Sequence, residues 1–447
     1  MCKKLKSNFE IFLNFTEEVI VMKKLVILLW LSVFLIVLMI NVNAITINFW
    51  TENTQPYQVA ILKTLINEFE AQNPNIHVDY RLVSWGNYMQ VFLTALKTNQ
   101  TPVVSQLGTT KMSFFWNEGG LVDLDKYITE DLKKDVIPSA WYSCQFNGQL
   151  FGIPWGVDAR YTFYRKDWFE KNNLPLPTNS WTWEDMINDA LKLTNTNKYT
   201  YGLGLCYDTA ENTGMQAFWS LLYSAGGSVL SEDGKTVTLN STQTLYALKL
   251  YTEPLLKYHI VPPSAPSLTG PDMVALFAKN EIGIYYSNNI SAYSQAVEAN
   301  PLLKDKIGVV LNPTINGKQK NFLGGSDLVM WKGHSQEEYQ AAWKWIEFLM
   351  STKVEAKYVL DLVGSLPSVG SAYSDPDFLS DLPYMKQYSN VFEQAVADGV
   401  EEPNLPITPV IESNIRQMIN SAALGTPLEE AIKRASEQIY SAMSNNS

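Results

Sequence analysis

Hydrophobic and polar positions follow two alternating periods along the first part of the chain. Residues 45–50, ITINFW, alternate as in a half-buried strand, and residues 59–70 place apolar side chains at helical spacing. A second strand at 76–82, a helix at about 86–97 and a short strand around 103–107 continue this order. Strand–helix repeats of this length predict a parallel sheet with right-handed crossovers and helices on its faces, an α/β fold.

The remainder of the chain carries the same two periods. A Ser/Thr cap predicts a helix from Trp183 to about Leu193, and residues 199–205 read as a strand. Residues 241–259 form an amphipathic pattern, and residues 270–289 predict a helix, a turn and a strand. The C-terminal segment is helical, with a break at residues 425–427, Gly-Thr-Pro.

Polar and aromatic residues gather where the first predicted strands end. In open parallel sheets, ligands bind beyond the carboxyl ends of the strands. Those ends carry Trp50 and Glu52 after the first strand, and Thr109 and Thr110 after the third. These residues are therefore candidates for ligand contacts, with a core position as the alternative for Trp50.

Asp158 and Arg160 follow a bend at Pro154 and are expected on one face of a strand, opposite Tyr161 and Phe163. Two polar groups placed between two strands, just after a proline bend, suit a seam between two lobes. The alternative is a packed strand pair in which Asp158 and Arg160 interact only with each other.

Residues 147–186, NGQLFGIPWGVDARYTFYRKDWFEK…LPLPTNSWTWEDM, resemble the central motif of a known class of proteins. The shared pattern is Gly-x-x-x-Gly-x-Pro, then Asp with a following Arg, then Tyr-x-Lys-Asp, then Pro-x-Thr/Ser-Trp. The class is the carbohydrate-binding proteins that serve ATP-binding-cassette (ABC) importers, the maltose-binding-protein-like solute-binding proteins. Further similarities at 119–128, 270–289 and 321–333 extend the resemblance over nearly all of the chain beyond residue 44.

The resemblance implies the two-lobe periplasmic binding protein fold (type II). Each lobe is expected to be a mostly parallel sheet flanked by helices, and a hinge of several chain crossings is expected to join them. Lobe 1 is predicted to comprise residues 45–156 and 312–362, and lobe 2 residues 157–311 and 363–447. The second crossing is expected at residues 307–313.

The resemblance also implies a sugar-binding cleft between the lobes. Asn288 and Asn289 stand where the class usually has a glycine and an aromatic residue, which favours amide hydrogen bonding there. Either Trp50 or Trp155 is expected to stack on the ligand. The predicted ligand-binding residues are Trp50, Glu52, Gln55, Thr109, Thr110, Trp155, Asp158, Arg160, Tyr207, Asp208, Asn288, Asn289, Gly325 and Asp327.

The N-terminus carries a targeting signal. Residues 25–40 are a continuous apolar run after two lysines, and Val42 and Ala44 suit a cleavage site. We therefore predict a signal peptide over residues 1–44, with Met22 as a possible true start. An uncleaved membrane anchor is the alternative.

Net charge, cysteines and histidines indicate which partners and sites are not expected. The net charge is −11, and removal of residues 1–44 takes away five lysines and three glutamates, which leaves an even more acidic chain. Such a chain is not expected to bind nucleic acid or anionic lipid. Cys144 and Cys206 are expected to be buried free thiols rather than a disulfide, and three scattered histidines predict no catalytic metal site.

These observations predict a secreted, monomeric, non-enzymatic sugar carrier without a cofactor. It would act in the periplasm or at the exterior of the cell envelope and deliver a sugar, expected to be an oligosaccharide, to the membrane permease subunits. Flat aromatic faces and bidentate polar side chains, both frequent here, suit a pyranose. The alternatives are a binder of glycerol phosphodiester or polyamine with the same fold, or a secreted glycoside hydrolase, which would need two carboxylates at a set separation.

Overall fold

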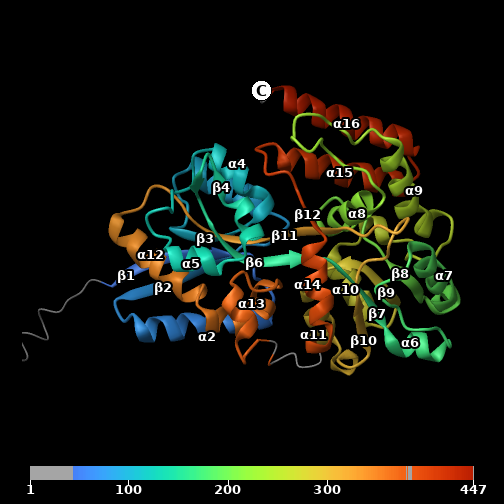
Figure 1. The fold of residues 1–447 in the computed structure, drawn as a ribbon, viewed down its shortest axis with the longest axis horizontal. Helices are drawn as coiled ribbons and strands as arrows, with labels where there is room; N and C mark the ends of the chain where they lie inside the picture. Colours follow the sequence, from blue (N-terminus) through green and yellow to red (C-terminus); the bar gives the residue numbers. More distant parts are fainter. Residues whose placement is uncertain (1–43, 379, 381–384, 446–447) are drawn as a thin grey trace, which may run out of the picture.

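Two lobes lie side by side in the computed structural model, which describes residues 44–378, 380 and 385–445 (Figure 1). The predicted two-lobe α/β fold is confirmed by its strands and flanking helices. The predicted signal peptide falls almost wholly on residues 1–43, outside the described residues, and stays a prediction.

Lobe 1 is built on three parallel strands with helices around them. Its strands and helices are β1 (Ile45–Thr51), α2 (Pro56–Gln72), β2 (Ile76–Leu82), α3 (Tyr88–Lys97), β3 (Val104–Gly108), α4 (Met112–Asn117), α5 (Glu130–Asp135), β4 (Gln145–Phe146), β5 (Gln149–Leu150), α12 (Gln336–Leu349) and α13 (Thr352–Val363). A short 3-10 helix, η1 (Thr109–Lys111), follows β3 directly.

Lobe 2 surrounds a four-stranded sheet and includes most of the C-terminal segment. Its elements are β7 (Tyr161–Arg165), α6 (Lys166–Lys171), α7 (Trp183–Leu193), β8 (Tyr201–Gly204), α8 (Thr213–Ser224), α9 (Thr242–Leu256), α10 (Gly270–Ala278), β9 (Ile282–Asn288), α11 (Ile290–Ala299), β10 (Ile307–Val310), α14 (Ser389–Ala397), α15 (Thr408–Ala423) and α16 (Leu428–Asn445). Helices α15 and α16 pack on α9, as the upper right of Figure 1 shows.

The two sheets are more mixed than the expectation of mostly parallel sheets. In lobe 1, β1 pairs in parallel with β2 and β3, whereas β11 (Asn321–Met330) pairs antiparallel with β3 and with β6 (Ile153–Ala159). In lobe 2 only β8 and β9 are parallel, because β7 pairs antiparallel with both β9 and β10. In lobe 1, the antiparallel strand β11 is the one by which the chain returns from lobe 2.

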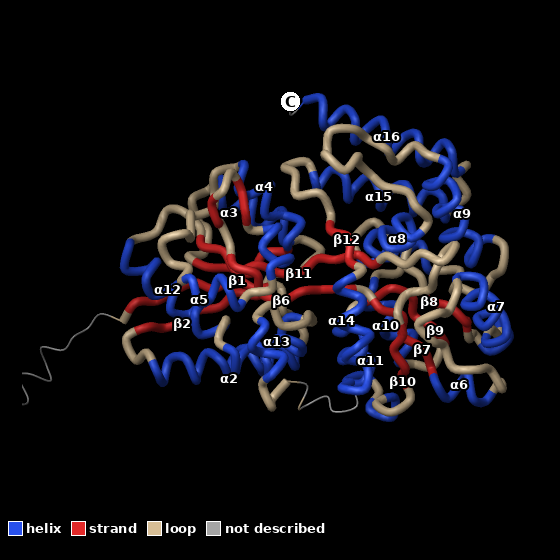
Figure 2. Tube along the Cα trace, in the orientation of Figure 1, coloured by secondary structure: helices blue, strands red, loops and turns tan. Residues whose placement is uncertain are grey.

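Strands β6 and β11 belong to both lobes, and Figure 2 shows them running from one to the other. The first half of β6, with Ile153 and Trp155, packs in the lobe 1 core, whereas Val157 and Ala159 pack in the lobe 2 core. Strand β11 runs the opposite way. Phe322 and Leu323 pack in lobe 2, and Leu328 and Met330 pack in lobe 1; the short β12 (Gly399–Glu401) pairs with its lobe 2 end.

Two glycines mark the points where these strands change lobe. Gly325 has φ +150°, and a Cβ on it would lie 2.2 Å from the carbonyl oxygen of Gly156. Gly156 has φ +99°, and a Cβ on it would lie 2.8 Å from the Cβ of Ser365. Three crossing segments therefore approach each other so closely that only glycine fits between them.

The second crossing does not lie at residues 307–313. Residues 307–310 form β10, an edge strand of the lobe 2 sheet, and Val309, Leu311 and Ile315 are buried in the lobe 2 core. The chain enters lobe 1 only at Gly325. We therefore propose that lobe 1 comprises residues 45–156 and 325–362, which moves the second boundary from residue 312, and that lobe 2 comprises the rest.

Local signals set several element ends as predicted. The hydroxyl of Thr182 accepts from the N–H of Asp185 at 3.1 Å, and the Asp185 carboxylate accepts from the N–H of Thr182 at 3.1 Å, so α7 starts at Trp183.

Both Cys144 and Cys206 are buried free thiols. Trp345, on α12, is fully buried in the lobe 1 core.

Candidate ligand-binding site

A cavity of about 430 Å³ lies between the lobes, at the carboxyl ends of β1 and β3. Its volume falls in the range of about 300–1,000 Å³ that is typical of small-molecule sites. Lobe 1 lines it with Glu52, Gln55, Gln58, Trp85, Tyr88, Thr109, Thr110 and Lys111. Lobe 2 lines it with Arg160, Glu211, Asn212, Gln216, Asn288, Asn289, Glu412 and Arg416, and the crossing segments add Asp158, Phe322, Gly325 and Ser365.

Glu52 follows the last residue of β1 and is the most isolated acid of the cavity. It is 1% exposed, and neither of its carboxylate oxygens has a hydrogen-bond partner on another described residue. Burial raises the pKa of Glu52 well above its usual range. Its backbone is held by Gln106 on β3, whose side-chain oxygen accepts from the Thr51 hydroxyl at 2.7 Å and from the N–H of Glu52 at 3.3 Å. A preformed strand end therefore presents two unused acceptors to the cavity.

Asp158 and Arg160 form an ion pair on the crossing from β6 into lobe 2. Arg160 Nη2 lies 3.1 Å from Asp158 Oδ2, and it also donates to the side-chain oxygen of Gln216 on α8. The guanidinium carbon lies 5.2 Å from the centre of the Phe322 ring. Burial raises the pKa of Asp158, and the charge of Arg160 opposes that rise. The two side chains therefore line the cavity and do not interact only with each other.

Two aromatic side chains supply a flat apolar surface in lobe 1. Trp85 is 42% exposed, and its ring centre lies 5.2 Å from that of Tyr88 in an edge-to-face arrangement at 73°. A Cβ on Gly108 would lie 3.2 Å from each of these two side chains, so this glycine lets the end of β3 approach them closely. Such a surface can stack on the C–H face of a ring-shaped ligand.

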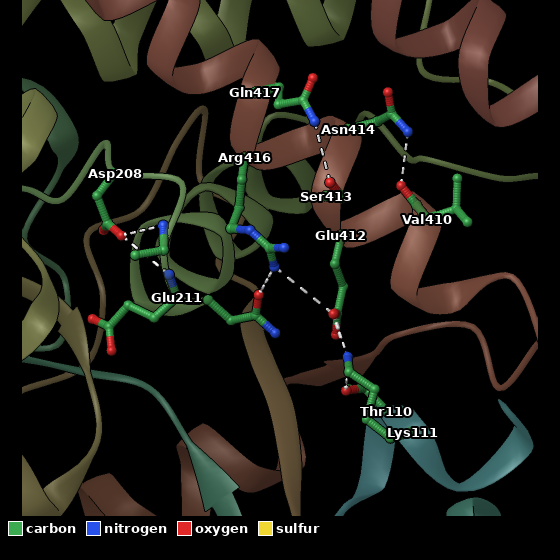
Figure 3. Close-up of polar contacts among 12 residues, drawn as sticks. Thr110, Lys111, Asp208, Glu211, Val410, Glu412, Ser413, Asn414, Arg416 and Gln417 are labelled. Atoms are coloured by element: carbon green, nitrogen blue, oxygen red, sulfur yellow. Dashed lines mark hydrogen bonds and ion pairs between the residues drawn. The ribbon is translucent and has the colours of Figure 1, made fainter. Parts of the chain in front are cut away.

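A cluster of charged side chains closes one part of the cavity (Figure 3). Lys111 of η1 forms an ion pair with Glu412 of α15, and its Nζ also donates to the Thr110 hydroxyl at 2.9 Å. Arg416 Nη1 lies 3.9 Å from Glu412 Oε2 and donates to the side-chain oxygen of Asn212. Burial opposes ionisation of Glu412, but Lys111, Thr110 and Arg416 together outweigh burial and lower the pKa of Glu412.

Nine of the fourteen predicted site residues line this cavity. They share a position at a strand end or on a crossing strand: Glu52, Gln55, Thr109, Thr110, Asp158, Arg160, Asn288, Asn289 and Gly325. Asn289 begins α11, and its side-chain oxygen accepts from the hydroxyl of Ser291 at 2.6 Å. Whether each residue touches a ligand stays a prediction.

The two tryptophans predicted to stack on a ligand do not line the cavity. Trp50 lies inside β1, its ring centre 5.4 Å from that of Phe92 on α3, with the Arg81 guanidinium over its face at 4.4 Å. Trp155 is fully buried inside β6 and lies edge-on to Phe49 at 6.3 Å. Both side chains therefore belong to packed strand faces, Trp155 and Trp50 each within a hydrophobic core cluster of lobe 1.

Three predicted polar residues also lie away from the cavity. The Tyr207 hydroxyl donates to the carbonyl of Tyr251 at 2.9 Å inside the lobe 2 core. Asp208 accepts from the N–H groups of Ala210 and Glu211 and so stabilises its own loop. Asp327 is fully buried next to the hinge, where it accepts from the Ser143 hydroxyl at 3.1 Å.

Several residues that line the cavity were not among the fourteen predicted ligand-binding residues. Trp85 and Tyr88 follow the carboxyl end of β2, so the strand-end rule applied to that strand would have found them. Gln216, Glu412 and Arg416 lie on helices far from any predicted strand end. Only the packing of α8 against β11 and of α15 against η1 brings these three to the cavity, and no local pattern signals it.

Within residues 44–378, 380 and 385–445, no helix combines the length and the apolar character that crossing a membrane needs. Over the same ranges, no cluster of three or more His, Cys, Asp or Glu side chains is arranged to hold a metal ion.

The chain is similar to known binding proteins over most of its length. It is 26% identical over 313 residues to a putative binding protein of Brucella abortus, an alignment that covers 70% of this chain and 73% of the relative. It is 24% identical over 294 residues to the diacetylchitobiose binding protein DasA of Streptomyces coelicolor, covering 65% of this chain and 66% of the relative.

Solved structures carry the same fold. An ABC transporter solute-binding protein from Thermotoga lettingae, bound with α-D-tagatose, superposes with a TM-score of 0.80 at 25% identity and covers 89% of this chain and all of that one. The family profile of the bacterial extracellular solute-binding proteins matches residues 53–356, about two thirds of the chain. The protein therefore belongs to the bacterial extracellular solute-binding proteins, as the sequence motifs indicated.

Proposed function

We propose that this protein captures a sugar or polyol in the interlobe cavity and delivers it to the permease of an ABC importer. The observation that carries the proposal is Glu52, a buried acid at the cavity wall with two unused acceptor oxygens. A buried carboxylate without partners is costly, and two neighbouring hydroxyl groups of a ligand would offset that cost. Vicinal hydroxyls are what sugars and polyols offer.

The rest of the cavity supports the same ligand class. Trp85 and Tyr88 offer an apolar face, and Gln216, Asn288 and Asn289 offer amide groups that both donate and accept. The relatives bind ligands of this kind, since the Thermotoga lettingae protein holds tagatose and DasA is named for diacetylchitobiose. An oligosaccharide is our finer proposal, because a cavity of about 430 Å³ leaves room for more than one sugar ring.

The charged side chains of the cavity do not suit the two charged ligands, a glycerol phosphodiester and a polyamine. Its cations, Lys111, Arg160 and Arg416, already contact carboxylates of the protein, which leaves little for a phosphodiester. A polyamine would meet these three cations in the same cavity, and like charges repel at such distances. We place the protein outside the cytoplasmic membrane and infer that it acts as a monomer without catalytic activity.

Tryptophan fluorescence of residues 45–447 tests the proposal. Maltose, D-tagatose, D-mannitol, diacetylchitobiose, glycerophosphocholine and spermidine are titrated in turn, and maltohexaose is incubated and followed by chromatography. A saturable change with a neutral sugar or polyol supports the proposal. A response to glycerophosphocholine or spermidine alone would show that the protein binds another class of ligand. Shortening of maltohexaose would show that the protein is an enzyme.

A further inference from the structure

The ion pair between Lys111 and Glu412 joins the two lobes. Lys111 lies on η1, directly after β3 of lobe 1, and Glu412 lies on α15, whose apolar face packs in the lobe 2 core. Both side chains are almost completely buried, at 2% and 3% exposure. Neither residue is part of a crossing segment, because the crossings lie at Gly156, Gly325 and Ser365, although β11 runs beside η1. Relative motion of the lobes about the hinge therefore makes or breaks this contact.

Further polar groups surround the pair on all sides. Thr110 accepts from Lys111, and Arg416 lies on the next turn of α15 beyond Glu412, as Figure 3 shows. Glu402, on the segment before α15, is also buried and interacts electrostatically with Glu412, Lys111 and Arg416. Burial and the neighbouring Glu412 raise the pKa of Glu402, so the cluster tends to hold one ionised acid for Lys111.

The energetics of a buried pair depend strongly on whether both members are present. Two buried charges in contact offset each other's desolvation, whereas removal of one partner leaves the other as an uncompensated buried charge. When the lobes separate, each charge is exposed to water, and the loss of its partner then costs little. The pair therefore affects the closed arrangement much more than the open one.

We propose that Lys111 and Glu412 form an interlobe latch that shifts the open–closed balance toward the closed form, both with and without ligand. A ligand that bridges the lobes binds more tightly when the closed form is more populated, so the latch raises affinity without having to touch the ligand. The Lys111–Glu412 pair also forms part of the cavity wall. The affinity part of this inference rests on the proposed sugar-binding function.

A double-mutant cycle tests the latch. The variants are Lys111→Met, Glu412→Leu and both together, and Lys97→Met is the control, because Lys97 pairs with Glu118 within lobe 1 and is 65% exposed. Each is measured for maltose binding by calorimetry and for radius of gyration without ligand by small-angle X-ray scattering. We expect each single variant to bind about 10- to 100-fold more weakly and to have a larger radius of gyration.

The double variant separates a latch from a direct ligand contact. Since it buries no lone charge but lacks the ion pair, it is expected to bind more tightly than either single variant and more weakly than the parent, with a radius of gyration between theirs. A double variant that matches the parent in affinity and radius of gyration, or one as weak as the weaker single variant, would overturn the latch, and so would single variants that match Lys97→Met. If maltose does not bind the parent, the proposed sugar class is in question, while the scattering comparison still decides the latch.

Discussion

At the scale of single residues, position relative to a strand end explains the outcome of the predictions on β1 and β3, but not of those on the crossing strands or after β8. Glu52 and Thr109 follow the ends of β1 and β3 and line the cavity, as the strand-end rule predicts. Trp50 and Trp155 lie one or more residues earlier and are packed inside strand faces. The alternation of apolar and polar positions does not distinguish an aromatic residue of the core from one of the cavity, because both kinds of residue fit the same alternation.

Glu52→Gln is expected to weaken binding of the cognate sugar by about 10- to 100-fold, because a carboxyl group with two oxygens that can accept hydrogen bonds is replaced by an amide that carries one acceptor oxygen. The thermal stability of the ligand-free protein should not fall, since a partnerless buried carboxylate is removed. Calorimetric titration and thermal unfolding measure the two effects. Glu68→Gln, an exposed acid on α2, is the matched control and should bind as the parent does.

Trp85→Phe is expected to abolish most of the fluorescence change on ligand binding, because Trp85 is the tryptophan that lines the cavity. Trp116→Phe should keep that change, since Trp116 stacks on Phe146 within lobe 1, away from the cavity. Fluorescence titration with a ligand that calorimetry shows to bind measures both. An unchanged signal in Trp85→Phe would place the ligand elsewhere.

At the scale of elements, the sequence predicts regular segments well and crossings less well. Helices α7 and α9 and strand β9 match the predicted segments because their caps and periodicity are local. The second crossing was placed too early, because β10 and the first half of β11 carry the same apolar pattern whichever core they enter. The choice between two cores is a tertiary effect that local pattern does not encode.

Gly325→Ala is expected to destabilise the fold more than Gly333→Ala. Both positions have positive φ, +150° and +102°, but a Cβ meets the Gly156 carbonyl at the first and nothing within 4 Å at the second. The control carries backbone strain alone, so the difference reports the overpacking, about 1–3 kcal/mol in the free energy of unfolding. Urea unfolding measures it, and equal losses would show that the hinge strands have room to separate.

At the scale of the whole molecule, two buried acids in or beside the crossing segments make stability depend on pH. Burial raises the pKa of Asp327 to about 7 and that of Glu355 to about 8. Asp327 accepts from Ser143, and Glu355 accepts from the N–H of Ser368 at 2.8 Å on the third crossing. The folded protein therefore holds protons that the unfolded chain releases at lower pH.

Stability is accordingly expected to fall as pH rises from about 5 to about 8. Each raised carboxyl favours the folded state fully below its unfolded pKa and loses that contribution as pH rises through the folded value, by up to about 1.4 kcal/mol per pH unit. Urea unfolding across this range measures the slope, which Asp327→Asn and Glu355→Gln should each reduce. A free energy of unfolding that rises between pH 5 and 8 would contradict this assignment.

A crystal structure of the protein with the tightest-binding neutral sugar or polyol tests most directly whether the ligand binds in the interlobe cavity. We predict that the ligand lies between the lobes, with hydroxyl groups within hydrogen-bond distance of Glu52 and Arg160 and a ring or chain face against Trp85 or Tyr88. A ligand bound outside this cavity, or one that leaves both Glu52 oxygens without a partner, would contradict it.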